Sequence, residues 1–113
     1  MKYFQIIIAA VLIFVGNVAI AQKVQTIKFE VGGNCEMCKE RIEKSVDVKG
    51  VKYAEYHLED HQMAVTFSTK KITEMEIHQL IANVGHDTDK VKASDEVYEG
   101  LHHCCKYRDE ETH

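Results

Sequence analysis

A pair of cysteines stands where an extended segment gives way to a helical one, and this junction limits the possible folds more than any other feature. Residues 32–38 read GGNCEMC, so that the two thiols lie three positions apart behind a double glycine. Glycines allow the backbone to bend sharply and would leave the sulfurs uncrowded. The unpaired N–H groups and the dipole at a helix start favour negative charge, so both thiols are expected to ionise readily. Such a pair serves either as a clamp for a soft metal ion or as a redox couple.

The apolar residues on either side of this junction define its two elements. Alternation of apolar and polar side chains predicts a strand over residues 24–31. Apolar residues at helical spacing predict a helix from Cys35 to about Val48, and Gly50 is placed to end it. The cysteine pair is therefore expected in the loop between the first strand and the first helix.

The chain after the first helix continues with two strands, a helix and a further strand. Residues 51–58 and 62–68 alternate and are joined by a polar turn, which predicts a hairpin. Thr73 and Glu76 have the spacing of a capping box that begins the second helix. Residues 86–92 are polar with one strong apolar residue, which is typical of a short strand at a sheet edge.

This order of elements predicts an α+β fold. Strand, helix, strand, strand, helix and strand pack most economically as a ferredoxin-like βαββαβ sandwich, with two helices on one face of a four-stranded antiparallel sheet. A short helix over residues 94–101 and a tail are expected to follow it. We therefore expect one small domain over residues 22–92 and a C-terminal extension over residues 93–113.

Residues 1–21 have the composition of an export signal. Lys2 precedes an unbroken apolar run from Ile6 to Val15, and small residues lead up to Ala21. We expect cleavage near Ala21, and hence an exported, periplasmic protein that is not embedded in the membrane when mature. An uncleaved anchor is the alternative, but the apolar run is shorter than the roughly 20 residues that a spanning helix needs.

Charge and residue content exclude several classes of function. The net charge is −4, and loss of Lys2 with the signal makes it one unit more negative. Nucleic acid is therefore not expected as a partner, because its phosphates need a basic face. No nucleophile with its base, carboxylate pair or phosphate-binding loop is apparent in the sequence, so an enzyme of these classes is not expected.

Four cysteines in an exported chain would ordinarily indicate two structural disulfides. Here Cys35 and Cys38 are too close in sequence to close a useful loop, and Cys104 and Cys105 are adjacent. A bridge between the two pairs remains open. Metal binding and thiol redox chemistry are the two interpretations that the spacing favours.

The chain resembles the heavy-metal-associated domain family, which includes small copper chaperones, the metal-binding modules of copper ATPases and periplasmic mercury-binding proteins. The resemblance covers about residues 24–92. The residues that carry it are Gly32, Cys35-Glu36-Met37-Cys38, Ile42-Glu43-Lys44, Gly50-Val51, Val65, Ile81 and Gly85.

This resemblance implies that Cys35 and Cys38 hold a soft ion such as Cu(I) through two sulfurs. It further implies a chaperone or scavenger that passes the ion to a metal-transporting ATPase or efflux component, as a monomer or a metal-bridged dimer. Two departures keep Zn(II), Cd(II) and Hg(II) open as alternatives. Gly33 stands where the family usually has methionine, and Glu36 places a carboxylate between the thiols.

The histidines of the domain divide into one candidate for the site and several outside it. His86 follows the second helix in a loop at the same end of the sheet as the cysteine pair, so it is a possible ligand or supporting residue. The alternative is a solvent-exposed loop histidine. His57 and His61 near the hairpin turn and His78 on the second helix are expected to be exposed.

The extension ends in a second group of potential ligands. A helix over residues 94–103 would climb about 15 Å at 1.5 Å per residue and so return the chain to the metal end after the fourth strand. We hypothesise that Cys104 and Cys105, with His103 or its neighbour His102, complete a three- or four-ligand site or a small copper–thiolate cluster. A disordered tail with a disulfide is the alternative.

Two other functions compete with delivery of a soft metal ion. A thiol–disulfide oxidoreductase would use the same cysteine spacing. However, the predicted order strand, helix, strand, strand has too few elements at its start for a thioredoxin-like fold. A regulatory or storage module would need the same clamp, so the sequence does not separate it from a chaperone.

Overall fold

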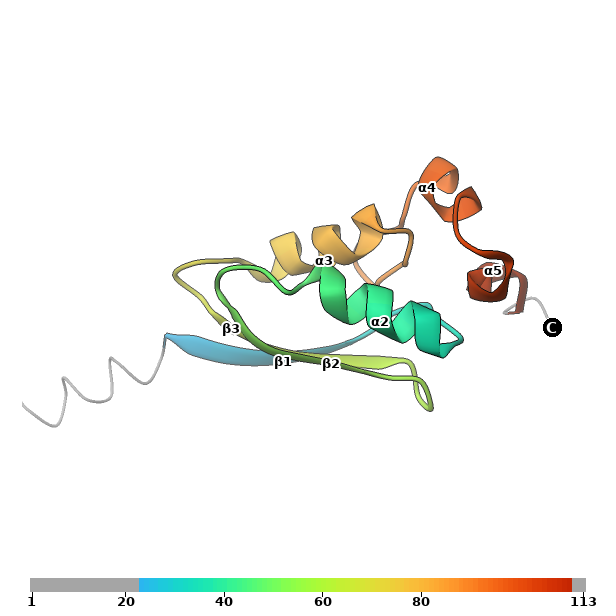
Figure 1. The fold of residues 1–113 in the computed structure, drawn as a ribbon. Coiled ribbons are helices and arrows are strands. Elements are labelled where there is room, and N and C mark those ends of the chain that lie inside the picture. The colour runs from blue at the N-terminus through green and yellow to red at the C-terminus, as the bar shows by residue number, and fades with distance from the viewer. Residues whose placement is uncertain (1–22, 111–113) are drawn as a thin grey trace, which may run out of the picture.

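The computed structural model describes residues 23–110 of the chain, and the predicted export signal and its cleavage site lie outside them. The elements in chain order are β1 (Val24–Glu30), α2 (Glu36–Ser45), β2 (Val51–His57), β3 (Gln62–Ser68), α3 (Glu74–Asn83), α4 (Asp95–Glu99), the 3₁₀ turn η1 (His103–Cys105) and α5 (Tyr107–Glu110). Helices α2 and α3 lie on the same face of the sheet (Figure 1). Among the described residues, no helix has the length and apolar character needed to cross a membrane.

The sheet is antiparallel, with β3 between β1 and β2. Met63 pairs with Phe29 and Val65 pairs with Ile27, so the apolar residues of both strands fall on the same face. All four side chains are buried. Because side chains alternate along a strand, this register turns the whole apolar set towards α2 and α3. The predicted ferredoxin-like α+β arrangement is confirmed.

The predicted fourth strand is reduced to a single bridge. Within the described chain, residues 86–92 pair with the sheet only through Thr88, opposite Val31. The Thr88 side-chain oxygen accepts hydrogen bonds from the backbone N–H groups of Lys90 (3.2 Å) and Val91 (3.0 Å). These bonds bend the chain and compete with an extended ladder. The prediction of a strand over residues 86–92 is therefore wrong.

Two glycines follow the helices, but only one of them does so as expected. Gly85, with φ of 104°, comes directly after the C-cap of α3. Gly50, with φ of 102°, lies instead in the turn before β2, because α2 already ends at Ser45. The predicted role of Gly50 in ending the helix is wrong. The predicted capping box at the start of α3 is confirmed, with Thr73 and Glu76 bonding each other's backbone N–H groups.

The C-terminal extension stays at one end of the sheet. Ser94 caps α4 through the N–H of Val97 (3.2 Å), but this helix is only five residues long. The longer returning helix predicted over residues 94–103 is wrong, and it is not needed, because residues 86–92 never carry the chain to the far end. In Figure 1 α4 and α5 lie beyond the end of the sheet where β1 stops and α2 begins.

Candidate metal centre

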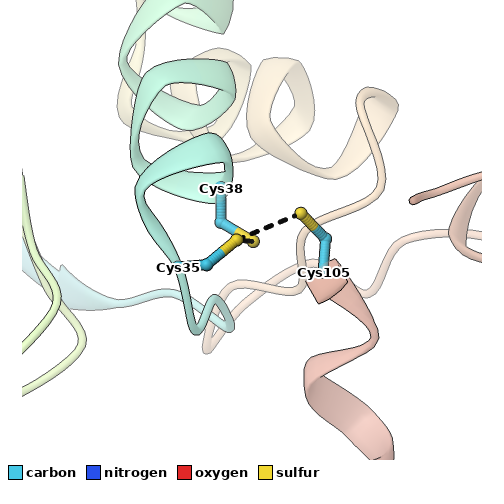
Figure 2. A group of neighbouring side chains, drawn as sticks. All are labelled: Cys35, Cys38 and Cys105. Atoms are coloured by element: carbon cyan, nitrogen blue, oxygen red, sulfur yellow. Dashed lines mark hydrogen bonds between the residues drawn. The ribbon is translucent and has the colours of Figure 1, made fainter. Parts of the chain in front are cut away.

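Three cysteine sulfurs converge at the start of α2. Cys35 is the N-cap residue of α2, Cys38 lies in the first turn, and Cys105 comes from η1 of the extension. The Cys35 sulfur lies 3.2 Å from that of Cys38 and 3.3 Å from that of Cys105. All three sulfurs lie within 4.8 Å of one another. Figure 2 shows the three side chains pointing toward a common point between α2 and the extension. The expected approach of the second cysteine pair to the first is thus observed, although only one of its members enters the group.

The burial of the three thiols is unequal. Cys38 and Cys105 are fully buried, whereas Cys35 is partly exposed. The buried Cys38 thiol donates a hydrogen bond to the Asn34 side-chain oxygen (3.3 Å). The expectation of two uncrowded sulfurs is therefore wrong, because Cys105 covers the pair from the side of the extension.

The double glycine is required for close approach and not for an unusual backbone angle. A Cβ atom added at Gly32 would overlap the aromatic ring of Tyr107, and one added at Gly33 would lie 3.0 Å from the hydroxyl of Tyr56. Neither glycine has a positive φ. Gly32 therefore gives the extension room to pack against the loop that carries the cysteine pair.

The segment that follows η1 is tied to residues 85–87 by hydrogen bonds. The Tyr107 hydroxyl donates to the Gly85 carbonyl (2.7 Å) and accepts from the Asp87 N–H (2.8 Å). The Arg108 guanidinium binds both carboxylate oxygens of Asp87, at 3.0 and 2.7 Å. These contacts hold Cys105 at the mouth of the cysteine pair.

A buried histidine and an arginine complete the surroundings of Cys105. The Arg41 guanidinium donates to the Cys105 sulfur (3.4 Å) and also lies 3.4 Å from Nε2 of His86. Nδ1 of His86 lies 2.7 Å from the carbonyl oxygen of Gly32, so it must carry the proton, and Nε2 then accepts from Arg41. Burial lowers the pKa of His86 to about 4, which keeps its ring neutral.

His86 was predicted as a possible ligand or supporting residue. It is fully buried, so the alternative of an exposed loop histidine is wrong. It stacks on the ring of Tyr107 at 5.4 Å and orients Arg41, and it is not one of the three residues in the close group.

The expectation that the thiols of the cysteine pair ionise readily is wrong for Cys38. Burial raises the pKa of Cys38 to about 12, and the neighbouring thiols add to this. Burial also raises the pKa of Cys105, but the hydrogen bond from Arg41 and those from the other thiols outweigh it and lower the pKa to about 7. Near neutral pH a thiolate is thus favoured on the extension at Cys105 and disfavoured at Cys38.

The remaining predicted ligands lie at the rim. The Cys104 sulfur is 4.0 Å from that of Cys35, 3.8 Å from the Met37 sulfur and 3.5 Å from Nδ1 of His102. Burial, and after it hydrogen bonding with the thiols of Cys105 and Cys35, raises the pKa of Cys104 to about 11. His103 is exposed and packs on the ring of His102. Which of these residues bind a metal ion stays a prediction.

The other histidines were predicted to be exposed. His61 is exposed and His57 is partly exposed. The prediction is wrong for His78, which is fully buried against the ring of Phe29 with its Nδ1 2.6 Å from the Thr88 hydroxyl. A polar residue beside the apolar stripe of α3 can turn inward when a loop supplies a hydrogen-bond partner.

Sequence reasoning missed three residues that shape this centre. Arg41 had a detectable signal, because it lies three positions after Cys38 and therefore on the same side of α2. Tyr107 and Arg108 had none, since their partners are about 20 residues away in the sequence and are met only in the folded chain.

Comparisons with known proteins identify the domain that carries the cysteine pair. Residues 28–87 match the heavy-metal-associated domain. Among solved structures, the CopZ metallochaperone is 26% identical with a TM-score of 0.55, and the match covers 57% of this chain and 98% of that one. Oxidized MerP from Ralstonia metallidurans CH34 is 26% identical with a TM-score of 0.56, covering 58% and 94%.

A copper binding domain from HMA7, a P-type ATPase, is also similar, at 26% identity and a TM-score of 0.54, covering 57% of this chain and 89% of that one. No curated protein matches the chain significantly. The extension that supplies Cys105 lies outside residues 28–87, which match the family. Because the matched domain spans more than half of the chain, the protein belongs to the heavy-metal-associated domain family.

Proposed function

We propose that this protein is an exported carrier of a soft metal ion, foremost Cu(I), which it holds through Cys35 and Cys38 and passes to a partner by ligand exchange. The observation that carries the proposal is the pair of sulfurs 3.2 Å apart at the start of α2, one buried and one partly exposed. The buried sulfur of Cys38 retains the ion while the accessible sulfur of Cys35 is open to replacement.

The chemistry of the donors supports a soft monovalent ion. Thiolates are soft ligands, and two or three of them satisfy Cu(I), whereas a structural Zn(II) site usually needs four ligands. Transfer then proceeds without redox change: a partner thiolate adds to the ion, and a Cys35 sulfur–metal bond breaks. Met37, 45% exposed beside Cys35, gives the partner an apolar contact at this point.

The similar structures support one class of partner. One of them is a copper binding domain from a P-type ATPase, and another is a metallochaperone. We infer that the partner is a metal-transporting ATPase or an efflux component with a thiol pair of its own. Delivery by a monomer and delivery through a metal-bridged dimer both start from the same exposed sulfur.

The competing redox function has less support. A thiol–disulfide oxidoreductase would use the same cysteine spacing, usually on a thioredoxin-like fold. The match of residues 28–87 to the heavy-metal-associated domain and the antiparallel strand order β1-β3-β2 support a metal-binding fold instead. We therefore propose a carrier and not an enzyme.

Native mass spectrometry of the full-length gene product tests the proposal. The protein is recovered reduced from a periplasmic extract and titrated anaerobically with Cu(I), then challenged with Zn(II), Cd(II) and Hg(II). We expect a mass that corresponds to cleavage near Ala21 and one Cu(I) per chain that the double variant Cys35→Ser/Cys38→Ser does not retain.

The Cys104→Ser variant serves as the control, because it removes a thiol at the rim. Failure of the wild type to retain Cu(I), or equal retention by the double variant, would refute the proposed site. Retention of another of the ions in preference to Cu(I) would correct the cargo and leave the carrier function in place.

A further inference from the structure

We propose that Cys105 is a third ligand of the metal ion and that residues 103–108, here called the latch, must lift before the ion can be transferred. This inference rests on the proposed function, since it concerns how the same site holds and releases its ion. It goes beyond that function because a two-sulfur carrier has no need of the extension.

The first observation is the geometry of the three sulfurs, which suits a site with three ligands. Three thiolates around an ion at a metal–sulfur distance of about 2.3 Å lie about 4 Å apart. The sulfurs of Cys35 and Cys38 lie 3.2 Å apart, those of Cys35 and Cys105 lie 3.3 Å apart, and none of the three distances exceeds 4.8 Å. A trigonal site therefore needs these two sulfur–sulfur distances to lengthen by less than about 1 Å each.

The second observation is the charge around Cys105, which compensates a third thiolate. A third thiolate adds one negative charge to a buried centre, which is costly unless a cation compensates it. Arg41 supplies that cation at 3.4 Å from the Cys105 sulfur. Its orientation is fixed by His86, which in turn is held by the Gly32 carbonyl. As the ion binds, any proton still on the three thiols passes to solvent.

The third observation is the attachment of the latch, which allows it to open separately from the domain. Its helical elements, η1 and the start of α5, are too short to be stable alone. It is held by side-chain bonds: those of Tyr107 and Arg108 to residues 85–87, that of Arg108 to the carbonyl of Ala93 (2.8 Å), and those of Lys106 to the carbonyls of Tyr98 (3.2 Å) and Glu99 (2.8 Å). Among the described residues the ladder bonds join only β1, β2 and β3, and segments outside the ladder open at a lower free energy than the core. The latch is thus able to lift while the sheet and α2 stay folded.

These three observations together imply an order of events in binding and release of the ion. With the latch closed, three sulfurs hold the ion and Cys105 occupies the position that a partner thiolate would take. With the latch open, the Cys105–metal bond is broken, Cys105 takes a proton from solvent, and the ion remains on Cys35 and Cys38. A partner thiolate then fills the vacant position, so the ion is never held by fewer than two sulfurs.

The adjacent cysteine provides a matched control. Cys104 and Cys105 share one turn, but only Cys105 is fully buried and bonded to Arg41. Cys104 is partly exposed and faces Met37 and His102. Serine at either position removes one thiol from the latch, and only one of the two changes removes the proposed ligand.

X-ray absorption spectroscopy of the Cu(I)-loaded full chain tests the ligand count directly. We expect three sulfur neighbours around copper in the wild type and in Cys104→Ser, and two in Cys105→Ser. Competition with a Cu(I) chelator should show an affinity about 10-fold or more weaker in Cys105→Ser, since even outer-shell changes alter metal affinity by about 10–100-fold.

A second pair of variants tests the latch. Tyr107→Phe and Arg108→Ala remove its bonds and leave all three thiols in place. We expect three sulfur neighbours in both, together with faster loss of Cu(I) to an excess of the chelator than in the wild type. Transfer no faster than in the wild type would refute the latch.

The outcomes separate this inference from the proposed function. Two sulfur neighbours in the wild type overturn the inference even if every variant misfolds, and the carrier function then stands. A third neighbour lost in Cys104→Ser and kept in Cys105→Ser also overturns it. Absence of Cu(I) binding by the wild type refutes the proposed function itself.

Discussion

Substitution of Gly32 by alanine should release the latch without touching a ligand. Gly32 does not have a positive φ, so its backbone accepts alanine without strain. The added methyl group would overlap the ring of Tyr107, with a distance of 2.6 Å to its Cδ2 atom and 3.1 Å to its Cζ atom. Because a Cβ atom essentially never approaches a non-bonded atom as closely as 2.6 Å, either the ring or the loop must move.

The size of the effect follows from the bonds that this ring positions. Displacement of Tyr107 breaks its hydrogen bonds with Gly85 and Asp87. At about 1 kcal/mol for each bond, closure of the latch loses roughly 2 kcal/mol. Since 1.4 kcal/mol is tenfold in an equilibrium constant, the open population should rise about 30-fold.

Alkylation of Cys105, followed by peptide mass spectrometry, measures this opening in the reduced apo protein. The thiol is fully buried when the latch is closed, so it reacts only from the open state, and the ratio of rates between variant and wild type reports the opening equilibrium. We expect a rate increase of about 30-fold in Gly32→Ala.

Gly100→Ala is the matched control, because its added Cβ would meet only backbone oxygens, the nearest at 3.4 Å, and its alkylation rate should stay close to that of the wild type. An unchanged alkylation rate in Gly32→Ala, with the melting temperature also unchanged, would show that the ring does not hold the latch.

Three further outcomes test the fold and the charge of the centre. Ile42→Ala, at a fully buried position beneath the cysteine pair, should lower the free energy of unfolding by about 2–5 kcal/mol in urea denaturation, whereas no loss would contradict its place in the core. Thr73→Ala should cost about 1 kcal/mol in the same assay because it removes the capping box with Glu76, and an unchanged midpoint would contradict that role. Because the pKa of Cys105 is lowered to about 7, its thiolate stabilises the fold above the ordinary thiol pKa, and this contribution is lost as the pH falls through 7. Thiolate absorbance should therefore titrate near pH 7 and shift to higher pH in Arg41→Met. A titration midpoint that this substitution does not move would refute the role of the guanidinium.

The sequence was sufficient to predict the elements whose side chains form the core. The periods of two and 3.6 residues in β1, α2, β2, β3 and α3 are imposed by burial of one face, and the register of β3 follows from the same alternation. Residues 86–92 have too few apolar residues for their conformation to be predicted from such a pattern. There the backbone conformation is decided by one side chain, Thr88, whose local bonds outweigh a weak preference for a strand.

The centre was predictable in part for a related reason. Spacing and position identified the cysteine pair, and the second pair was expected to reach it, but by a long helix that does not exist. The actual route depends on Tyr107 and Arg108, whose partners lie far away in the sequence. Which of two adjacent cysteines turns inward is likewise settled by the twist of a 3₁₀ turn, to which no pattern of apolar residues corresponds.

The Cys105 thiolate has a consequence for the choice of ion. Arg41 belongs to α2, so its charge is present with or without the extension, and the extension alone adds one ligand and one negative charge. With Arg41 included, Cu(I) on Cys35 and Cys38 gives a centre with no net charge, and a third thiolate makes this centre negative. A divalent ion on the same pair gives a positive centre, which the third thiolate neutralises. The added charge therefore favours a divalent ion, whereas three thiolates satisfy Cu(I) and fall short of the four ligands that a structural Zn(II) site usually has. Competition between Cu(I) and Zn(II) in the wild type and in Cys105→Ser measures which of the two effects is larger.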